Sequence, residues 1–382
     1  MKSMKKSESI FIFKSFLIWR ISLFIILYFA IKFLTLQSNY LGGGLQNYLQ
    51  NPYLWSWGNF DGEHYLSLSL YGYKSLEQAF FPIFPMLISF IAYPFSQTVL
   101  SGIISHTIVG LLISNVSFLI TLFYLSELIK IDFSKKIAIL TILFIVCFPT
   151  SFFFGSLYNE SLFLLLVVLT FLNGRKGKWF QACFFGIVAS ATRVFGVLLL
   201  PVLLIEAYQS KAKFSQYFWI LFIPLGLIFY MMYQYITVGD ALAFYHLQTI
   251  IGSQHQGGFI SLPQVYFRYI KILLSLDRLN PLYQTIVLEF IIGIIFLILP
   301  LVGYFKKIRL SYIFYSLVGF LIPTIQGSFS STTRYVIVLF PSFIILALIT
   351  DKSKIIKYIL LTMFTLLLII ETVLFLRGYW VA

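Results

Sequence analysis

Residues 102–129 read GIISHTIVGLLISNVSFLITLFYLSELI, and Glu127 is the one charged side chain in this run. The run is long enough to cross the ~30 Å hydrocarbon core of a bilayer as a single helix. Similar runs recur along all 382 residues, of which 60% are hydrophobic and 10% are charged. Soluble domains carry about 25% charged residues. The sequence therefore predicts an all-α polytopic membrane protein and excludes an ordinary soluble enzyme, a disordered chain and a disulfide-rich secreted scaffold.

The formal net charge is +14, which in a soluble protein would suggest a nucleic-acid partner. Here the basic residues gather between apolar runs, as they do in the cytoplasmic loops of membrane proteins, so we expect no nucleic acid to bind. Cys147, Cys183 and His106 lie within apolar runs and are expected to pack as core residues. The basic clusters lie within residues 2–20, 130–136, 175–178, 211–213, 306–309 and 352–357.

If every basic cluster lies inside, the number of crossings between neighbouring clusters must be even. Three apolar runs, 16–36, 81–95 and 102–129, separate Arg20 from Lys130, so one of them does not span. Run 81–95 is short and rich in proline. We expect it to lie along the outer membrane surface or to re-enter slightly.

The same walk along the chain predicts about 11 spans, with the N-terminus inside and the C-terminus outside. Residues 1–382 then form a single membrane domain with two large outer segments, 37–101 and 237–282. Smaller outer loops are expected near residues 150–160 and 326–334. The other predicted spans are residues 137–150, 158–173, 179–191, 194–207, 216–236, 283–304, 310–325, 334–350 and 355–376.

The scarce ionisable residues away from the basic loops are the most informative, because such groups near membrane depth are rare and usually functional. The predicted topology brings them from distant parts of the chain to one outer face. Carboxylates and arginines that converge in this way would suit an anionic substrate. These residues, with the histidines beside them, are Asp61, Glu63, His64, Glu160, Arg193, Asp240, His246 and Arg334.

Several of these residues also have a purely structural interpretation. Asp61 could cap a juxtamembrane helix. Glu160 could pair with Arg193 as a buried tie between helices, and Arg334 could contact lipid phosphates. Trp57 suits the aromatic belt at the outer interface, but it could also stack on a sugar. The residue types and their spacing leave these alternatives open.

The polar stretches resemble the PIG-V family, which comprises GPI mannosyltransferase 2 and its prokaryotic relatives. Residues 60–65 (FDGEHY), 71–73 (YGY) and 79–85 (AFFPIFP) correspond to the family patterns W-D-G-x-H-Y, G-Y and F-F-P-x-F-P. The chain departs from the family at Phe60, where the family has Trp, and at Ala241, where prokaryotic relatives often have Pro. Further matches lie at residues 158–163 (YNESLF), 193–196 (RVFG), 239–248 and 334–335.

This resemblance implies the GT-C glycosyltransferase architecture, in which the first outer loop carries an acidic catalytic residue and juxtamembrane helices. It implies transfer of a sugar, usually mannose, from a polyprenyl-phosphate donor to an acceptor hydroxyl with inversion. Asp61 would be the base, Glu63 a supporting carboxylate, and His64 would orient the acceptor or the phosphate. Arg193 and Arg334 would hold the donor phosphate, because guanidinium groups suit phosphate oxygens. The expected substrate-binding residues are Trp57, Tyr158, Glu160, Asp240, His246 and Gln248.

The partners and location follow less directly. No metal ligands are assigned, although the spacing of Asp61 and Glu63 would permit Mg²⁺ or Mn²⁺. The acceptor could be a glycolipid, a glycan or a protein, and the expected location is the plasma membrane of a prokaryote, with the endoplasmic reticulum as the alternative. Two other classes remain open: a lipid-linked sugar flippase or transporter, and a non-catalytic subunit with a GT-C shell. A transporter would favour polar groups across the membrane midplane and inverted repeats.

Overall fold

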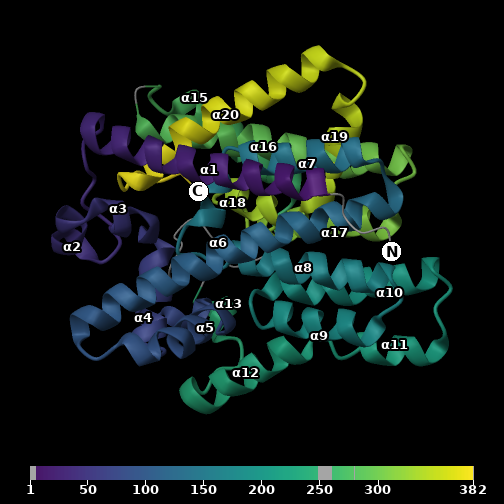
Figure 1. The fold of residues 1–382 in the computed structure, drawn as a ribbon, viewed down its shortest axis with the longest axis horizontal. Coiled ribbons are helices and arrows are strands. Elements are labelled where there is room, and N and C mark those ends of the chain that lie inside the picture. Colours follow the sequence, from purple (N-terminus) through teal and green to yellow (C-terminus); the bar gives the residue numbers. More distant parts are fainter. Residues whose placement is uncertain (1–5, 248–259, 279, 382) are drawn as a thin grey trace.

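The computed structural model describes residues 6–247, 260–278 and 280–381, and within them the regular structure is entirely helical. The long helices run side by side along the long axis of the molecule (Figure 1). The expectation of an all-α polytopic membrane protein is confirmed. The helices of seven or more residues are α1 (Lys6–Phe33), α2 (Gly44–Gln50), α4 (Asp61–Tyr71), α5 (Ile83–Ala92), α6 (Val99–Asp132), α7 (Lys135–Cys147), α8 (Glu160–Arg175), α9 (Trp179–Ser190), α10 (Leu199–Gln209), α11 (Phe214–Ile220), α12 (Leu225–Val238), α15 (Leu262–Ser275), α16 (Pro281–Phe305), α17 (Leu310–Thr324), α19 (Phe340–Thr350) and α20 (Lys354–Leu376).

Five segments of the described chain are long and apolar enough to cross a membrane: Lys6–Phe33, Val99–Asp132, Phe214–Val238, Leu282–Phe305 and Lys354–Leu376. A sixth would be the pair Thr332–Val338 and Phe340–Thr350, which meet at an angle of 83°. Helices α7, α8, α9 and α17 are 13, 16, 12 and 15 residues long, shorter than a straight span of about 20 residues. The count of about 11 spans therefore stays a prediction.

Helix α5 occupies the run that the charge walk excludes from spanning. It has 10 residues, so it is about 15 Å long, half the thickness of a hydrocarbon core. One face, with Phe84 and Ile88, is buried, while Met86 and Phe90 on the other face are exposed. A single helix of this length cannot cross the bilayer. With one face packed on the protein and an apolar face exposed, it suits a position along the membrane surface.

The predicted inner basic clusters meet at one end of the bundle through ion pairs. Lys130 Nζ lies 2.6 Å from Glu8 Oε1, and Lys136 Nζ lies 2.7 Å from Asp351 Oδ1. Figure 1 places the start of α1, the α10–α11 connection and the α19–α20 connection at this end, while α2 and α4 lie toward the other. Segments far apart in the sequence are thus joined where the charge pattern predicts a common side.

Glu206 is the centre of this charged end. Its side chain is 1% exposed, and it binds Arg309 through both oxygens, at 2.7 and 3.2 Å. Ser311 Oγ donates at 2.8 Å and Arg175 Nη1 lies 3.4 Å away. Arg175 in turn reaches Asp132 Oδ1 at 2.6 Å. The network ties α6, α8, α10 and α17 together.

For two segments the structure adds the depth within the protein, while their side of the membrane stays a prediction. Arg20, grouped by sequence with the inner cluster 2–20, lies 4.3 Å from the Trp57 ring and 4.5 Å from the Phe24 ring. It stands about 18 Å along α1 from Glu8, because a helix rises 1.5 Å per residue. Residues 150–160, expected as an outer loop, are all buried, including the 3₁₀ helix η4 (Ser151–Gly155). Charge and hydropathy indicate the side of a membrane, not the depth inside the protein.

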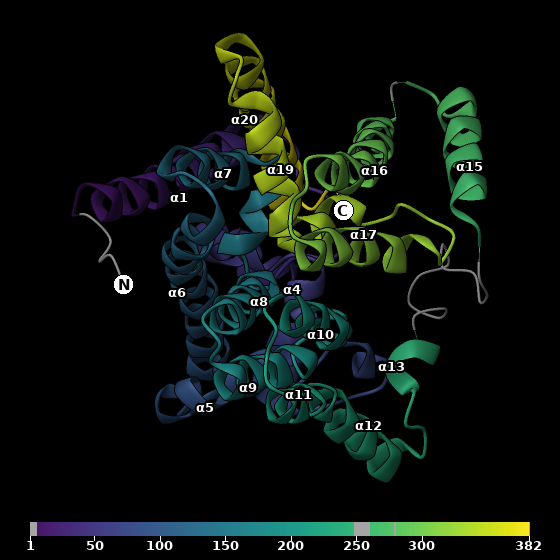
Figure 2. The same cartoon turned by 90° about the vertical axis from the view of Figure 1, so that its right-hand side faces the viewer.

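The core residues picked out by sequence behave as predicted. His106 is 4% exposed, and its Nδ1 lies 2.9 Å from Ser69 Oγ. Cys147 and Cys183 are free thiols, of which Cys183 is buried. Figure 2 shows the same bundle from the end, with α15 at its edge beside α16 and with α12 at another edge.

We predict that Glu206→Ala lowers the free energy of unfolding by roughly 3–5 kcal/mol, because it leaves two guanidinium groups without their shared buried carboxylate. Thermal unfolding of the purified protein in detergent would measure the loss. The matched control is Asp351→Ala, whose partner Lys136 is 65% exposed, and which is expected to cost under about 1 kcal/mol. Equal losses for the two variants would contradict the prediction.

Candidate active site

Asp61 begins helix α4, and the turn that presents it is strained. Phe60 precedes it with φ 57° and ψ −122°, close to the first central position of a type II′ turn, where glycine is usual. The carbonyl of Asn59 accepts from the N–H of Gly62 at 3.3 Å across this turn. Strain of this kind costs on the order of 1–3 kcal/mol and persists only where the surroundings enforce it.

The surroundings of Phe60 supply that enforcement. Its N–H donates to the carbonyl of Tyr40 at 2.9 Å. Its ring lies 5.9 Å from the Tyr40 ring, 6.0 Å from Phe375 and 5.7 Å from Trp380. Two segments more than 300 residues apart therefore hold the turn before Asp61.

Asn59 fixes the same turn from inside the protein. Its side chain is fully buried, and Oδ1 accepts from the N–H of Gly42 at 2.8 Å. Nδ2 donates to the carbonyl of Phe375 at 2.8 Å, while the backbone carbonyl of Asn59 accepts from Tyr158 at 2.8 Å. Gly42 is required here, because a Cβ would come within 2.2 Å of the Trp55 carbonyl oxygen.

Four charged residues then form one continuous network. Arg334 Nη1 lies 2.6 Å from Asp61 Oδ2, and Arg334 Nε lies 3.1 Å from Glu160 Oε1. The same Glu160 oxygen accepts from Arg193 Nη1 at 2.7 Å, and Asn159 Oδ1 accepts from Nη1 at 3.3 Å. Two carboxylates and two guanidinium groups make the network neutral as a whole. Its members come from α4, α8, the start of the 3₁₀ helix η5 (Val194–Leu198) and α18 (Thr332–Tyr335).

Burial varies across this network in a way that matters for binding. The Glu160 side chain is 1% exposed and that of Asp61 is 31% exposed. Within the described residues, Arg334 donates a hydrogen bond through Nη1, while Nε lies at ion-pair distance from Glu160 without a hydrogen bond, which leaves Nη2 for a ligand. Glu160 Oε2 is buried with no hydrogen-bond partner in the described part of the chain. The network thus has a solvent-accessible carboxylate, Asp61, at one end and a buried hydrogen-bond acceptor without a donor, Glu160 Oε2, inside.

Aromatic rings enclose the guanidinium groups. Arg334 lies 5.4 Å from the rings of Tyr158 and Tyr335 and 5.7 Å from that of Phe153. Arg193 lies 5.6 Å from the Tyr335 ring. Such contacts stabilise a cation away from water.

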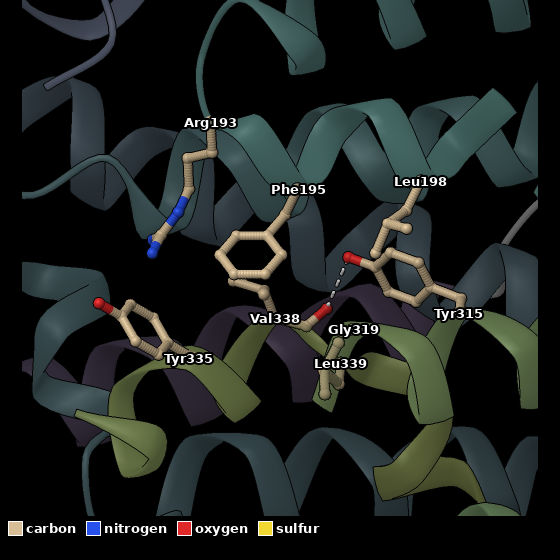
Figure 3. Close-up of a pocket in the computed structure, with 8 residues that line it drawn as sticks. All are labelled: Arg193, Phe195, Leu198, Tyr315, Gly319, Tyr335, Val338 and Leu339. Carbon is tan, nitrogen blue, oxygen red and sulfur yellow. Dashed lines mark hydrogen bonds between the residues drawn. The ribbon is translucent and has the colours of Figure 1, made fainter. Parts of the chain in front are cut away.

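A narrow cavity opens beside Arg193 (Figure 3). Its volume is about 10 Å³, room for roughly one water molecule. Figure 3 shows the Arg193 guanidinium pointing toward Tyr335, with Phe195 between Arg193 and the hydrogen bond from Tyr315 to the Val338 carbonyl, 3.4 Å long. A ligand larger than water could enter only if lining side chains such as Phe195 moved.

Glu63 and His64 follow Asp61 on α4 but do not join the network through its ion pairs. Glu63 Oε1 accepts from the N–H of Gly44 at 3.2 Å, and burial raises the pKa of Glu63. His64 is exposed and stacks on Phe80, with ring centroids 4.8 Å apart. The two side chains therefore have partners of their own outside the network, and their predicted roles stay predictions.

Trp57 and Tyr158, both expected to contact substrate, pack into the protein. Each is 1% exposed. Trp57 Nε1 donates to the carbonyl of Tyr53 at 3.1 Å, and the ring lies beside Arg20. This packing favours a structural role for Trp57, whereas Tyr158 still contacts Arg334.

The second predicted outer segment contributes a separate pair. His246 Nδ1 lies 2.7 Å from Asp240 Oδ2, and this hydrogen bond lowers the pKa of Asp240. Helix α13 (Ala243–His246) packs near the first segment, where Phe244 lies 5.5 Å from Phe81. Gln248 lies outside the described residues. The hydrogen bonds of Asp240, with His246 and with the N–H of Leu242, do not connect it to Asp61.

Within the described residues, no group of three or more histidine, cysteine or acidic side chains is arranged to hold a metal ion. Asp61 faces Arg334 and Glu63 faces Gly44, so the two carboxylates have separate partners. Use of Asp61 and Glu63 by Mg²⁺ or Mn²⁺ stays a prediction.

Sequence reasoning missed two residues that shape the site. Asn59 directly precedes the FDGEHY stretch and Asn159 lies within YNESLF, but neither was given a role. The available signal was the same for both: an amide side chain close to a predicted site carboxylate, which must find partners when buried.

Fold and site together define a polytopic membrane protein with a buried arginine–carboxylate centre. Residues 41–219 match the family described as Mannosyltransferase (PIG-V). The match confirms the family resemblance over this region and supports a membrane glycosyltransferase. It includes Asp61, Glu160 and Arg193, while Arg334 joins the network from outside it. None of the curated proteins compared with the chain matches it.

We predict that Phe60→Gly is more stable than Phe60→Ala by about 1 kcal/mol, because only glycine adopts the φ of 57° without strain. Thermal unfolding of both purified variants would measure the difference. Ser67 of α4 gives the matched control, since Ser67→Gly should be less stable than Ser67→Ala, the ordinary order in a helix. The ordinary order at position 60 would disprove the strained turn.

Proposed function

We propose that this glycosyltransferase moves a sugar, mannose by its family, from a polyprenyl-phosphate donor to an acceptor hydroxyl at the outer face of the membrane. The observation that carries the proposal is the continuous network from Asp61 through Arg334 and Glu160 to Arg193. A partly exposed carboxylate beside buried guanidinium groups supplies a base and a phosphate site at adjacent positions.

In the proposed reaction, Asp61 accepts the proton of the acceptor hydroxyl as its oxygen forms a bond to the anomeric carbon. The bond from that carbon to the phosphate oxygen breaks, and its electron pair leaves with polyprenyl phosphate. Because phosphate is a good leaving group, no general acid is needed, and one displacement inverts the sugar carbon.

Arg334 is proposed to change partners during this reaction. Its Nη1 holds Asp61 at 2.6 Å in the structure. A donor phosphate that bound Arg334 would compete for this guanidinium and loosen its hold on Asp61. Donor binding would then free the base, which limits deprotonation to a loaded site.

Glu160 and Arg193 support this centre. Glu160 Oε1 bridges the two guanidinium groups and keeps them together despite their like charges. Its buried Oε2 has unused lone pairs that could accept a hydrogen bond from a sugar hydroxyl. Arg193 offers further N–H groups to the phosphate, whose charge increases as the sugar leaves, and stabilising that charge is often the largest catalytic term.

We predict that Asp61→Asn lowers the turnover rate at least about 100-fold, because the amide cannot accept the hydroxyl proton. The assay is release of polyprenyl phosphate from polyprenyl-phosphate mannose by the purified protein, supplied with membrane lipid extract as acceptor. The matched control is Asp132→Asn, which neutralises an aspartate paired with arginine at the same 2.6 Å distance. Near wild-type turnover in Asp61→Asn would refute Asp61 as base, and equal losses in both variants would point to damage to the fold.

The assignment of faces makes a separate prediction. In a background without Cys147 and Cys183, cysteines are introduced at Gln46 in α2 and at Ser210 after α10, both exposed and toward opposite ends of the bundle. A membrane-impermeant maleimide added to intact cells should label Gln46→Cys, and should label Ser210→Cys only after permeabilisation. The reverse pattern would place the active site on the inner face.

A further inference from the structure

We propose that Glu289 of α16 is a positioning residue that sets the orientation of Arg334 through the backbone of Ser331. The inference rests on the proposed function, in which Arg334 binds the donor phosphate. Glu289 lies outside residues 41–219, the part of the chain that matches the family.

Both oxygens of Glu289 are engaged, and the side chain is buried. The residue is 3% exposed. Oε1 accepts from the N–H of Ser331 at 2.8 Å, and Oε2 accepts from the Tyr269 hydroxyl at 2.7 Å. Packing alone would not require a carboxylate here, since an apolar side chain fills such a position at lower desolvation cost.

Ser331 is the residue on which the α18 turn depends. It has φ 60° and ψ 8°, the left-handed region that is unfavourable for a residue with a Cβ. Its carbonyl accepts from the N–H groups of Arg334 and Tyr335, each at 3.0 Å. Helix α18 has only four residues, too few to hold their own shape. The hydrogen bond from Ser331 to Glu289 therefore stabilises the conformation that aims Arg334.

A second anchor makes the orientation specific. Thr150 Oγ1 donates to the carbonyl of Thr333 at 2.7 Å, from the segment between α7 and α8. With Ser331 held by Glu289 and Thr333 held by Thr150, the residue that follows projects its guanidinium between Asp61 and Glu160. Loss of the Glu289 anchor would leave the turn free to relax its strain and to move Arg334 from this position.

The test is equilibrium binding of polyprenyl phosphate, the proposed leaving group, to the full-length protein in detergent, which requires no acceptor. Glu289→Gln is expected to raise Kd about tenfold, because its amide can accept from only one of the two donors and presents an N–H group to the other. Arg334→Ala is expected to raise Kd by at least as much. The double variant should match Arg334→Ala within about twofold, since Glu289 acts through Arg334.

Glu371→Gln is the matched control. Glu371 is a fully buried acid on the neighbouring helix α20, and its Oε1 accepts from Gln284 at 2.8 Å. It should lower stability but leave Kd unchanged. If Glu289→Gln does not fold, Tyr269→Phe replaces it, alone and in the double variant with Arg334→Ala. Tyr269→Phe removes one hydrogen bond to the same carboxylate and is expected to raise Kd about two- to threefold.

The outcomes separate the two proposals. A Kd that Glu289→Gln leaves unchanged, or that rises in the double variant by the product of the single effects, overturns the positioning role alone. A rise as large in Glu371→Gln overturns it as well, because it would mean a general effect of losing a buried acid. A Kd that Arg334→Ala leaves unchanged overturns the phosphate-binding role in the proposed function.

Discussion

Burial of charge is the constraint on which the rest of this structure depends. Moving an ion from water into a protein interior costs several kcal/mol even after relaxation, and the cost is offset only by well-placed partners. Glu160, at 1% exposure, meets this demand with two arginines on one oxygen. Arg334 in turn needs Asp61. Removing any member leaves a charge without compensation, so α4, α8, η5 and α18 have to meet at this centre.

A second constraint follows from the first. Side chains reach the centre from irregular segments, and irregular backbone at membrane depth is tolerated only inside protein, where each polar group finds a partner. The segment around η4 is fully buried and satisfies this rule. The N–H of Leu157 donates to the Trp57 carbonyl at 2.9 Å, and Ser114 donates to the Tyr158 carbonyl at 2.9 Å. The same bonds that satisfy the backbone also hold the segment before Asp61 against the segment before Glu160.

These two constraints explain what the sequence could predict. Hydropathy and charge predicted the all-α membrane class, the non-spanning run at α5, and the gathering of Asp61, Glu160, Arg193 and Arg334 on one side. The pairing of Glu160 with Arg193, one of two open alternatives, is confirmed. These predictions need only the position of a residue along its own helix, and the pattern of apolar and charged residues nearby in the sequence indicates that position.

The remaining features depend on distant parts of the chain meeting in space. The strained turn at Phe60 requires the ring of Trp380 and the carbonyl of Phe375, which no local pattern reveals. The contact of Arg20 with Trp57 and the depth of residues 150–160 likewise come from packing between segments. Arg334 pairs directly with Asp61, which neither the helix-cap nor the lipid-phosphate interpretation predicted.

The neutrality of the network bears on how the proposed reaction is controlled. Two carboxylates balance two guanidinium groups while the site is empty, so the bound donor phosphate adds a negative charge that only the arginines can offset. Arg334 would hold Asp61 through Nη1 and meet the phosphate through Nη2, and a second anion on the same guanidinium weakens its attraction for the first. Binding of the donor would therefore loosen the hold on the base. A carboxylate that keeps a guanidinium on one oxygen until the sugar arrives has less freedom to orient and activate water, the competing nucleophile.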